Sequence, residues 1–233
     1  MNPPLSPHRL SEQTLFAGLA ASELEELAAA AVLKRASEGA FFFLQGDPAS
    51  HILLLTEGRA RIYQLTADGQ QVVHRLIGPW SLFGALALTQ AETYPVNAEA
   101  LEDCQAAAWS KDVLMGFVLR WPRMALNAMQ MMAVHLQSYQ DRFRELATER
   151  VEQRLARTLV RLAAQSGRKT EQGVLIDLPL SRQDLAEMTG TTLYTASRVL
   201  SRWEGEGLVL LGRERVTIRY PHGLVSIAED LPR

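Results

Sequence analysis

Two short predicted helices around a glycine turn mark the C-terminal part of the chain. Ser181 precedes the first helix, where its hydroxyl can accept a hydrogen bond from the backbone N–H of Asp184. Residues 189–191, Thr-Gly-Thr, supply a turn whose glycine can adopt a left-handed conformation. A second helix is predicted over residues 192–206, and residues 208–220 alternate apolar and polar side chains as a β-hairpin does. This order predicts a helix-turn-helix followed by a β-wing.

The second helix has the composition of a DNA recognition helix. Its apolar side is predicted to consist of Leu193, Ala196, Val199, Leu200 and Trp203. Arg198 is the predicted base reader, because a guanidinium can bond O6 and N7 of guanine together. Arg202 lies one turn further on and, like Ser181 and Arg182 at the first helix start, is predicted to meet phosphate. The predicted DNA-binding residues are Ser181, Arg182, Thr192, Tyr194, Thr195, Ser197, Arg198 and Arg202.

The two-helix pattern alone also fits a protein in which Arg198 is only a solvated surface residue. The wing and a long helix upstream favour DNA binding. The charge distribution agrees, since the chain from Glu149 onward has 13 Lys or Arg against 11 Asp or Glu, within a net charge of −2 for the whole.

Residues 32–110 change to a strand-like period. Short apolar runs at 40–44, 51–57, 60–65 and 71–77 are separated by corners rich in Gly, Asp and Pro. The corner at 66–69, Thr-Ala-Asp-Gly, predicts a hairpin turn with Gly69 at positive φ. These features predict an antiparallel barrel or jelly roll. Before it, residues 11–31 predict a helix, with Ser22 as N-cap and Glu25 at the capping-box position.

A helical period returns at Lys111, and Pro122 is predicted to occupy the first turn of a new helix. Apolar side chains then alternate steps of four and three residues over three heptads. This seam consists of Ala125, Met129, Met132, Leu136, Tyr139, Phe143 and Leu146. The narrow 3.5-residue period favours a parallel coiled-coil homodimer. The alternative is a helix that packs its apolar stripe on its own barrel.

Composition excludes several classes of protein. Apolar residues make up 47% of the 233 residues, yet no run approaches the roughly 20 apolar residues of a membrane span. No basic-then-apolar leader opens the chain. The single cysteine, Cys104, cannot form an internal disulfide, which favours a cytoplasmic location, and one thiolate cannot hold an iron–sulfur cluster. Cys104 follows Asp103 in a predicted turn without a neighbouring cation, so it is expected to be unreactive.

From about residue 15 to 222 the chain resembles the Crp/Fnr family of transcription regulators. The most specific motifs are LSRQDLA at 180–186, TASRVL at 195–200 and the segment 78–84 with its Leu-Phe-Gly. The resemblance implies an α+β protein that is not an enzyme. It has a cyclic-nucleotide-binding-like β jelly roll with N-terminal helices in residues 1–121, a dimerisation helix in 122–148 and a winged helix-turn-helix in 149–233. Implied partners are a near-palindromic double-stranded DNA site, a second copy of the chain and RNA polymerase, with no membrane.

Departures from the family pattern limit which effectors and which DNA sequences the chain is expected to bind. The resemblance implies that cyclic-nucleotide members hold the phosphate with a Glu directly after this Gly and an Arg-Ser pair some ten residues on. Here these positions are Ala85, Pro95 and Val96, which argues against cyclic AMP. The oxygen-regulator branch needs several N-terminal cysteines, which are absent, although the Ser197-Arg198 pair matches its base-contacting pair. Tyr194 replaces the usual Glu, so the target sequence is not predicted.

The effector therefore stays open at the level of sequence. The predicted effector pocket consists of His74, Gly84, Ala85, Leu86, Tyr94, Pro95 and Val96. Family members linked to nitrogen oxides, some with haem, suggest His74 or His51 as a haem ligand, whereas each can equally be an ordinary strand residue. A second hypothesis is a constitutive regulator without effector. A third is a cupin-type metal enzyme, which needs clustered His and carboxylate ligands that this barrel, with only two histidines, does not offer.

Overall fold

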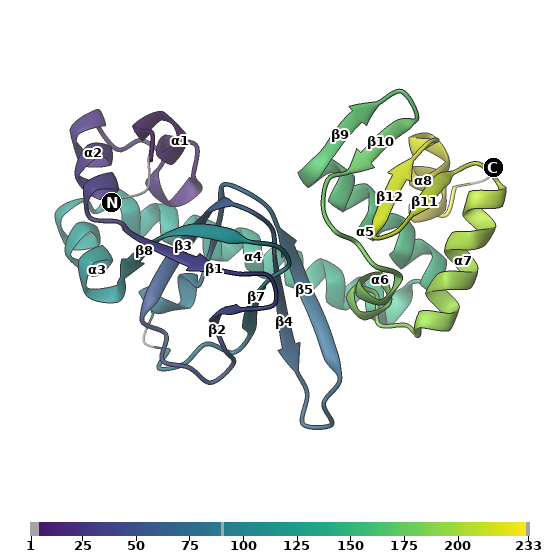
Figure 1. Ribbon diagram of the computed structural model, residues 1–233, viewed down its shortest axis with the longest axis horizontal. Helices are drawn as coiled ribbons and strands as arrows, with labels where there is room; N and C mark the ends of the chain where they lie inside the picture. Colours follow the sequence, from purple (N-terminus) through teal and green to yellow (C-terminus); the bar gives the residue numbers. More distant parts are fainter. Residues whose placement is uncertain (1–4, 90, 232–233) are drawn as a thin grey trace. The chain divides into compact units, whose positions relative to one another are not determined.

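The computed structural model describes residues 5–89 and 91–231, which form an α+β protein of two compact units (Figure 1). The first unit comprises the chain up to Leu65 together with Leu76–Tyr139, and the second comprises Thr66–Arg75 together with the chain from Gln140 onward.

The first unit begins with three short helices, α1 (Pro7–Ser11), the 3-10 helix η1 (Thr14–Phe16) and α2 (Ala21–Ala29). The prediction of Ser22 as N-cap with Glu25 was wrong. The N-cap is Ala20, whose backbone N–H donates to the Glu23 carboxylate at 2.7 Å. Ala20 has no side-chain acceptor, so the acidic residue three positions on supplies the capping interaction alone.

Two four-stranded sheets follow, with strand orders β1-β8-β3-β6 and β2-β7-β4-β5. The strands are β1 (Val32–Ala36), β2 (Phe41–Phe43), β3 (His51–Glu57), β4 (Ala60–Leu65), β5 (Gln71–Ile77), β6 (Ser81–Phe83), β7 (Asn97–Ala100) and β8 (Cys104–Ser110). The predicted bounds of β3, β4 and β5 are confirmed, and β2 is one residue shorter at each end. Gly69 has φ 77° in the predicted turn, where its N–H donates to Thr66 O at 2.9 Å. The jelly-roll prediction is confirmed.

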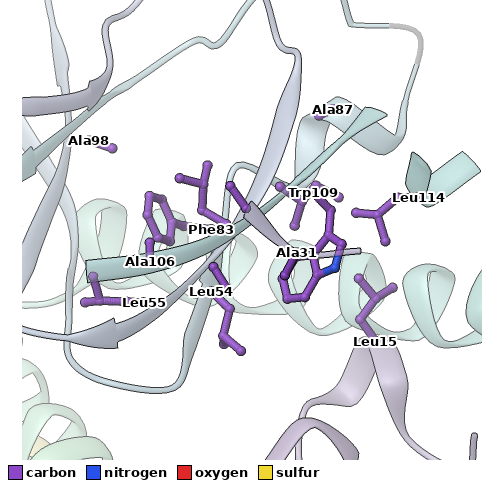
Figure 2. Packing of buried hydrophobic residues seen from close by; sticks show 14 of the residues in the cluster. Leu15, Ala31, Leu54, Leu55, Phe83, Ala87, Ala98, Ala106, Trp109 and Leu114 are labelled. Carbon is purple, nitrogen blue, oxygen red and sulfur yellow. The ribbon is translucent and has the colours of Figure 1, made fainter. Parts of the chain in front are cut away.

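The core of this unit lies between strands and helices, as the packed side chains in Figure 2 show. Trp109 on β8 is fully buried, with its indole N–H donating to Leu27 O at 2.8 Å and its ring 5.5 Å from that of Phe16. A buried indole N–H needs such an acceptor. This one side chain therefore fixes the N-terminal helices on the sheet.

Two helices end the unit, α3 (Lys111–Arg120) and α4 (Arg123–Thr148). Pro122 directly precedes α4 and its carbonyl accepts from Ala125 N at 3.0 Å, so the helix begins one residue later than predicted. Met124 is buried in the barrel core. The chain passes from the first unit to the second between Tyr139 and Gln140, so α4 contributes residues to both units.

The second unit surrounds helix α5 (Val151–Ser166). It further contains β9 (Gly167–Thr170), β10 (Gly173–Ile176), α6 (Arg182–Met188), α7 (Leu193–Gly205), β11 (Val209–Gly212), β12 (Arg215–Ile218) and α8 (Pro221–Ala228). Its strands form one antiparallel sheet of order β11-β12-β10-β9, with β10 beside β12 (Figure 1). In the described part of the chain, no helix is long and apolar enough to span a membrane.

Candidate nucleic-acid interface

A reciprocal cap begins α6. Ser181 Oγ accepts from Asp184 N at 3.0 Å, and Asp184 Oδ2 accepts from Ser181 N at 3.0 Å and from Ser181 Oγ at 2.6 Å. The predicted capping pair is therefore present. The same geometry commits both the hydroxyl hydrogen and the backbone N–H of Ser181 to Asp184, so Ser181 can meet a phosphate only by giving up part of its cap.

The turn between α6 and α7 is held tightly. Gly190 has φ 59°, and Thr189 Oγ1 donates to Leu185 O at 2.6 Å. A methyl group at Gly190 would lie 2.8 Å from Leu146 Cδ2. Gly190 therefore meets two requirements together, a left-handed backbone and close approach to the end of α4.

Helix α7 presents a polar face from its first turn. Thr192 is the N-cap, with Oγ1 accepting from Thr195 N at 3.2 Å. Ala196, Val199, Leu200 and Trp203 are buried, as predicted. Leu193 precedes Ala196 on the same side of the helix and is 47% exposed, so the buried part of that side begins at Ala196.

The exposed face of α7 carries the residues predicted to contact DNA. Tyr194 is 74% exposed, and Arg198 is exposed one turn further on, in line with it along the helix. Ser197 and Thr195 are half-buried beside them. Among residues 5–89 and 91–231, neither Arg198 nor Arg182 makes an ion pair, so both guanidinium groups are available.

Arg202 differs from these two arginines. Its guanidinium pairs with Glu152 of α5 at 2.7 Å and with Glu206 at 3.7 Å. The hydrogen bond to Glu152 raises the pKa of Arg202 above its ordinary value. Sequence reasoning missed this pairing, because Glu152 is 50 positions away and only the packing of α5 against α7 brings it close.

The wing is confirmed as β11 and β12 with a tight turn between them. Glu214 takes φ 53° at its tip, and Glu214 O accepts from Leu180 N at 3.0 Å, which joins the wing to the start of α6. Arg213 and Arg215 flank Glu214 and are exposed. Sequence reasoning named neither, although the Arg-Glu-Arg run at the predicted hairpin tip was a usable signal for phosphate contact.

The barrel positions that would hold a cyclic phosphate carry no cation. Gly84 has φ 75°, and a methyl group there would lie 2.9 Å from His51 O. Ala85 and Leu86 begin the 3-10 helix η2 (Ala85–Leu88), Pro95 is exposed and Val96 is half-buried. The left-handed turn at Gly84 is therefore present, but positions 85, 95 and 96 have no charged side chain that could bind a phosphate.

A cavity of about 180 Å³ lies beside this turn. Of the predicted effector-pocket residues only Tyr94 lines it, with Oη donating to His51 O at 2.6 Å and accepting from His51 N at 2.9 Å. The other lining residues are Lys34, Phe42, Phe43, Asp47, Pro48, Ser50, His51 and Leu53. Tyr94 stacks on Phe43 with ring centroids 3.8 Å apart, so its place is fixed by the wall of the cavity.

The two candidate haem ligands belong to different compact units. His51 lines the cavity, its Nδ1 is 2.9 Å from Ser50 Oγ, and burial lowers its pKa, with a smaller contribution from Lys34. His74 lies in the second unit, where His74 O accepts from Arg142 Nη1 at 2.6 Å and burial again lowers the pKa of the ring. The cavity is smaller than the roughly 300–1,000 Å³ of small-molecule and cofactor sites, so the geometry does not fit haem at His51.

Neither a reactive thiol nor a metal-binding cluster is found among the described residues. Cys104 is the buried first residue of β8 rather than part of a turn, and burial raises the pKa of its thiol, which keeps it protonated. Within the described residues, no three His, Cys, Asp or Glu side chains are grouped as a metal ion would require.

Two segments of the chain match known protein families. Residues 33–120 match the family described as cyclic nucleotide-binding domain, and residues 153–227 match the Crp-like helix-turn-helix domain. The chain belongs to the Crp/Fnr family of transcription regulators. A relative described as cyclic AMP receptor protein, from Thermus thermophilus, is 29% identical over 93% of this regulator and 97% of its own length.

Two further relatives cover most of this Crp/Fnr regulator. The anaerobic regulatory protein of Bacillus subtilis is 28% identical, over 86% of this chain and 85% of its own. The solved structure of FixK2 from Bradyrhizobium japonicum has a TM-score of 0.75 and 22% identity, over 84% of this chain and 96% of that chain, and shows the shared fold.

Proposed function

We propose that this Crp/Fnr regulator binds a near-palindromic DNA site as a homodimer, with Arg198 as its main base reader. The observation that carries the proposal is the exposed polar face of α7, with an Arg198 guanidinium that has no ion-pair partner among the described residues. Thr192, Tyr194, Thr195 and Ser197 share this face. Arg182, at the start of α6, supplies phosphate contact. Arg202 contributes only if DNA replaces Glu152 as its partner.

Replacement of Arg198 by Ala tests the base reader. The expected loss of affinity for an operator selected from random DNA is about 1–3 kcal/mol, with relaxed preference at one base position. Arg182→Ala is the matched control, because removal of a phosphate contact weakens binding to all sequences alike and lowers the magnitude of the salt slope by about 1 for each protomer of the proposed dimer. Unchanged operator affinity and preference in Arg198→Ala would remove Arg198 from this role.

Homodimerisation is supported by the surface of α4. Along the predicted seam, Met129, Met132, Leu136, Tyr139, Phe143 and Leu146 are each 53–75% exposed. Six large apolar side chains in one continuous stripe form a surface of the kind that monomers rarely leave open to water. The alternative, a stripe packed on its own barrel, leaves these exposures unexplained. Ala125 at the N-terminal end is half-buried.

The barrel is proposed as the sensory part, with a small organic anion rather than cyclic AMP as its effector. The cavity offers the Lys34 ammonium, which has no ion-pair partner among residues 5–89 and 91–231, together with Ser50, His51 and an aromatic wall. The cavity also has a carboxylate, Asp47, whose Oδ2 accepts from Leu44 N at 2.8 Å. Its volume of about 180 Å³ lies below the roughly 300–1,000 Å³ of most ligand sites, which favours a small anion.

Thermal unfolding with acetate, lactate or inorganic phosphate tests the sensory proposal. A ligand that binds the folded state raises Tm with its concentration, and Lys34→Gln should abolish that rise. Identical Tm and operator affinity with every anion would favour the constitutive regulator instead.

The hypothesis that His51 or His74 ligates haem can be tested directly. Added haem should give no Soret shift that depends on His51, because the cavity beside His51 has a volume of only about 180 Å³. A stoichiometric haem complex that is lost in His51→Ala would reverse this expectation, and one that is lost in His74→Ala would identify His74 as the ligand. RNA polymerase as partner and the cytoplasm as location also remain predictions, drawn from the family and from the DNA target.

A further inference from the structure

The end of α4 is attached to α5 by two charge pairs, one of them on a buried carboxylate. Glu145 is only 6% exposed and accepts from Arg161 Nη1 at 2.9 Å. Glu149 accepts from Arg157 Nε at 2.9 Å and 3.0 Å, through both carboxylate oxygens. Both arginines lie on α5, so two separate ion pairs hold the last turns of α4 against that helix.

A third arginine of α5, Arg154, reaches further. Its Nη1 donates to Glu149 O at 2.7 Å, directly after the end of α4. Its Nε donates to Thr189 O at 2.9 Å, and its Nη2 lies 3.5 Å from Gly190 O, both in the turn that precedes α7. One planar guanidinium therefore joins the end of the seam helix to the turn that aims the recognition helix.

An apolar contact lies beside this guanidinium. Leu146, the last seam residue, approaches so closely that a methyl group at Gly190 would be 2.8 Å from its Cδ2. The same side chain is 53% exposed on the proposed dimer face. Leu146 thus belongs both to the proposed dimer seam and to the surroundings of the turn.

We infer that Arg154 is a positioning residue that fixes the recognition helix relative to the dimer seam and thereby sets the half-site spacing that the dimer accepts. The inference rests on the proposed homodimer. One additional base pair between half-sites moves one of them by roughly 3.4 Å and rotates it by about 35° around the DNA axis. Arg154 and the two ion pairs hold the end of α4 and the turn before α7 in one position. The recognition helix therefore cannot move by that distance and angle without breaking hydrogen bonds.

The experiment compares operators with identical half-sites and central spacings shortened by one base pair, unchanged, or lengthened by one. We expect the wild-type protein to lose at least about tenfold in affinity at either altered spacing. In Arg154→Gln the loss should shrink to about threefold or less, while affinity for a single half-site stays within about threefold of wild type. Arg150→Gln removes an equal charge from an exposed neighbouring position and should keep the wild-type spacing profile.

Arg154→Lys keeps the charge but lacks the fork that reaches three carbonyl groups, so it should behave as Arg154→Gln does. This variant also carries the test if Arg154→Gln fails to fold. Wild-type spacing profiles in both folded variants would overturn the inference. Failure of the wild-type protein to prefer any operator would instead overturn the proposed function, which keeps the two failures distinct.

Discussion

Gly190 is the residue at which backbone conformation and packing demand the same side chain. Its φ of 59° disfavours any side chain, and Leu146 occupies the space of a methyl group. We expect Gly190→Ala to lower the free energy of unfolding by about 1–2 kcal/mol or more, measured by urea denaturation. Gly205→Ala is the control, because nothing lies within 4 Å of a methyl group there. Equal effects of the two substitutions would contradict the combined argument from backbone conformation and packing.

His74 predicts a pH dependence of stability. Burial, and secondarily the charge of Arg142, lowers the pKa of its imidazole below 6.5. Below about pH 6.5 the unfolded chain therefore binds the proton more readily than the folded protein, so the free energy of unfolding falls as the pH decreases. The contribution is fully present above that pH. His74→Asn should show a shallower decrease between roughly pH 7 and 5 in chemical denaturation, and an unaltered slope would exclude His74 as a source.

Residues with local roles could be predicted from sequence, and residues with distant partners could not. The Ser181–Asp184 cap depends on three neighbouring positions, which the sequence displays directly. The pairing of Arg202 with Glu152 depends on the packing of two helices far apart in the chain. The lining of the cavity could not be predicted for the same reason, because Lys34, Asp47 and Tyr94 come together only when both sheets have formed.

At the scale of elements, the wing is expected to supply charge rather than sequence preference. Arg213 and Arg215 lie at its exposed tip, which is joined to α6 through the Leu180–Glu214 hydrogen bond. Each phosphate contact contributes about 0.9 to the slope of log K against log salt concentration. Arg213→Ser with Arg215→Ser removes two contacts from each protomer of the proposed dimer and should therefore lower the magnitude of that slope by up to about 3.6, with base preferences unchanged. Arg35→Ser, an exposed arginine of the barrel, should leave the slope as it is.

Strands were predictable where an apolar run ends at corners rich in Gly, Asp or Pro. The bounds of β3, β4 and β5 agree with that pattern, although none of the three alternates strictly between buried and exposed residues and β3 is buried from Ile52 to Leu55. The hairpin of β9 and β10 was missed, because all four residues of β9 are exposed and carry no apolar alternation. Helix α4 was predicted, and a second copy of the chain is the proposed partner of its seam.

At the scale of the whole molecule, the proposed dimer should depend on single seam positions. Phe143 is 75% exposed in one chain, so Phe143→Glu leaves each unit folded while it places a charge in the seam. We expect sedimentation to show a monomer and operator binding to fall to the level of one half-site. Gln137→Glu, on the same helix but outside the seam, should remain dimeric. A dimeric Phe143→Glu protein would contradict the assignment of the seam.

The shared helix has a consequence for how the protein melts. Met124 is anchored in the barrel core, whereas Glu145 is anchored in the second unit, and one uninterrupted helix of 26 residues joins them. An isolated half of such a helix is marginal in water, so loss of either core removes support from the other. The two units should therefore unfold as one calorimetric transition. Cleavage by a protease at Tyr139 should split that transition in two.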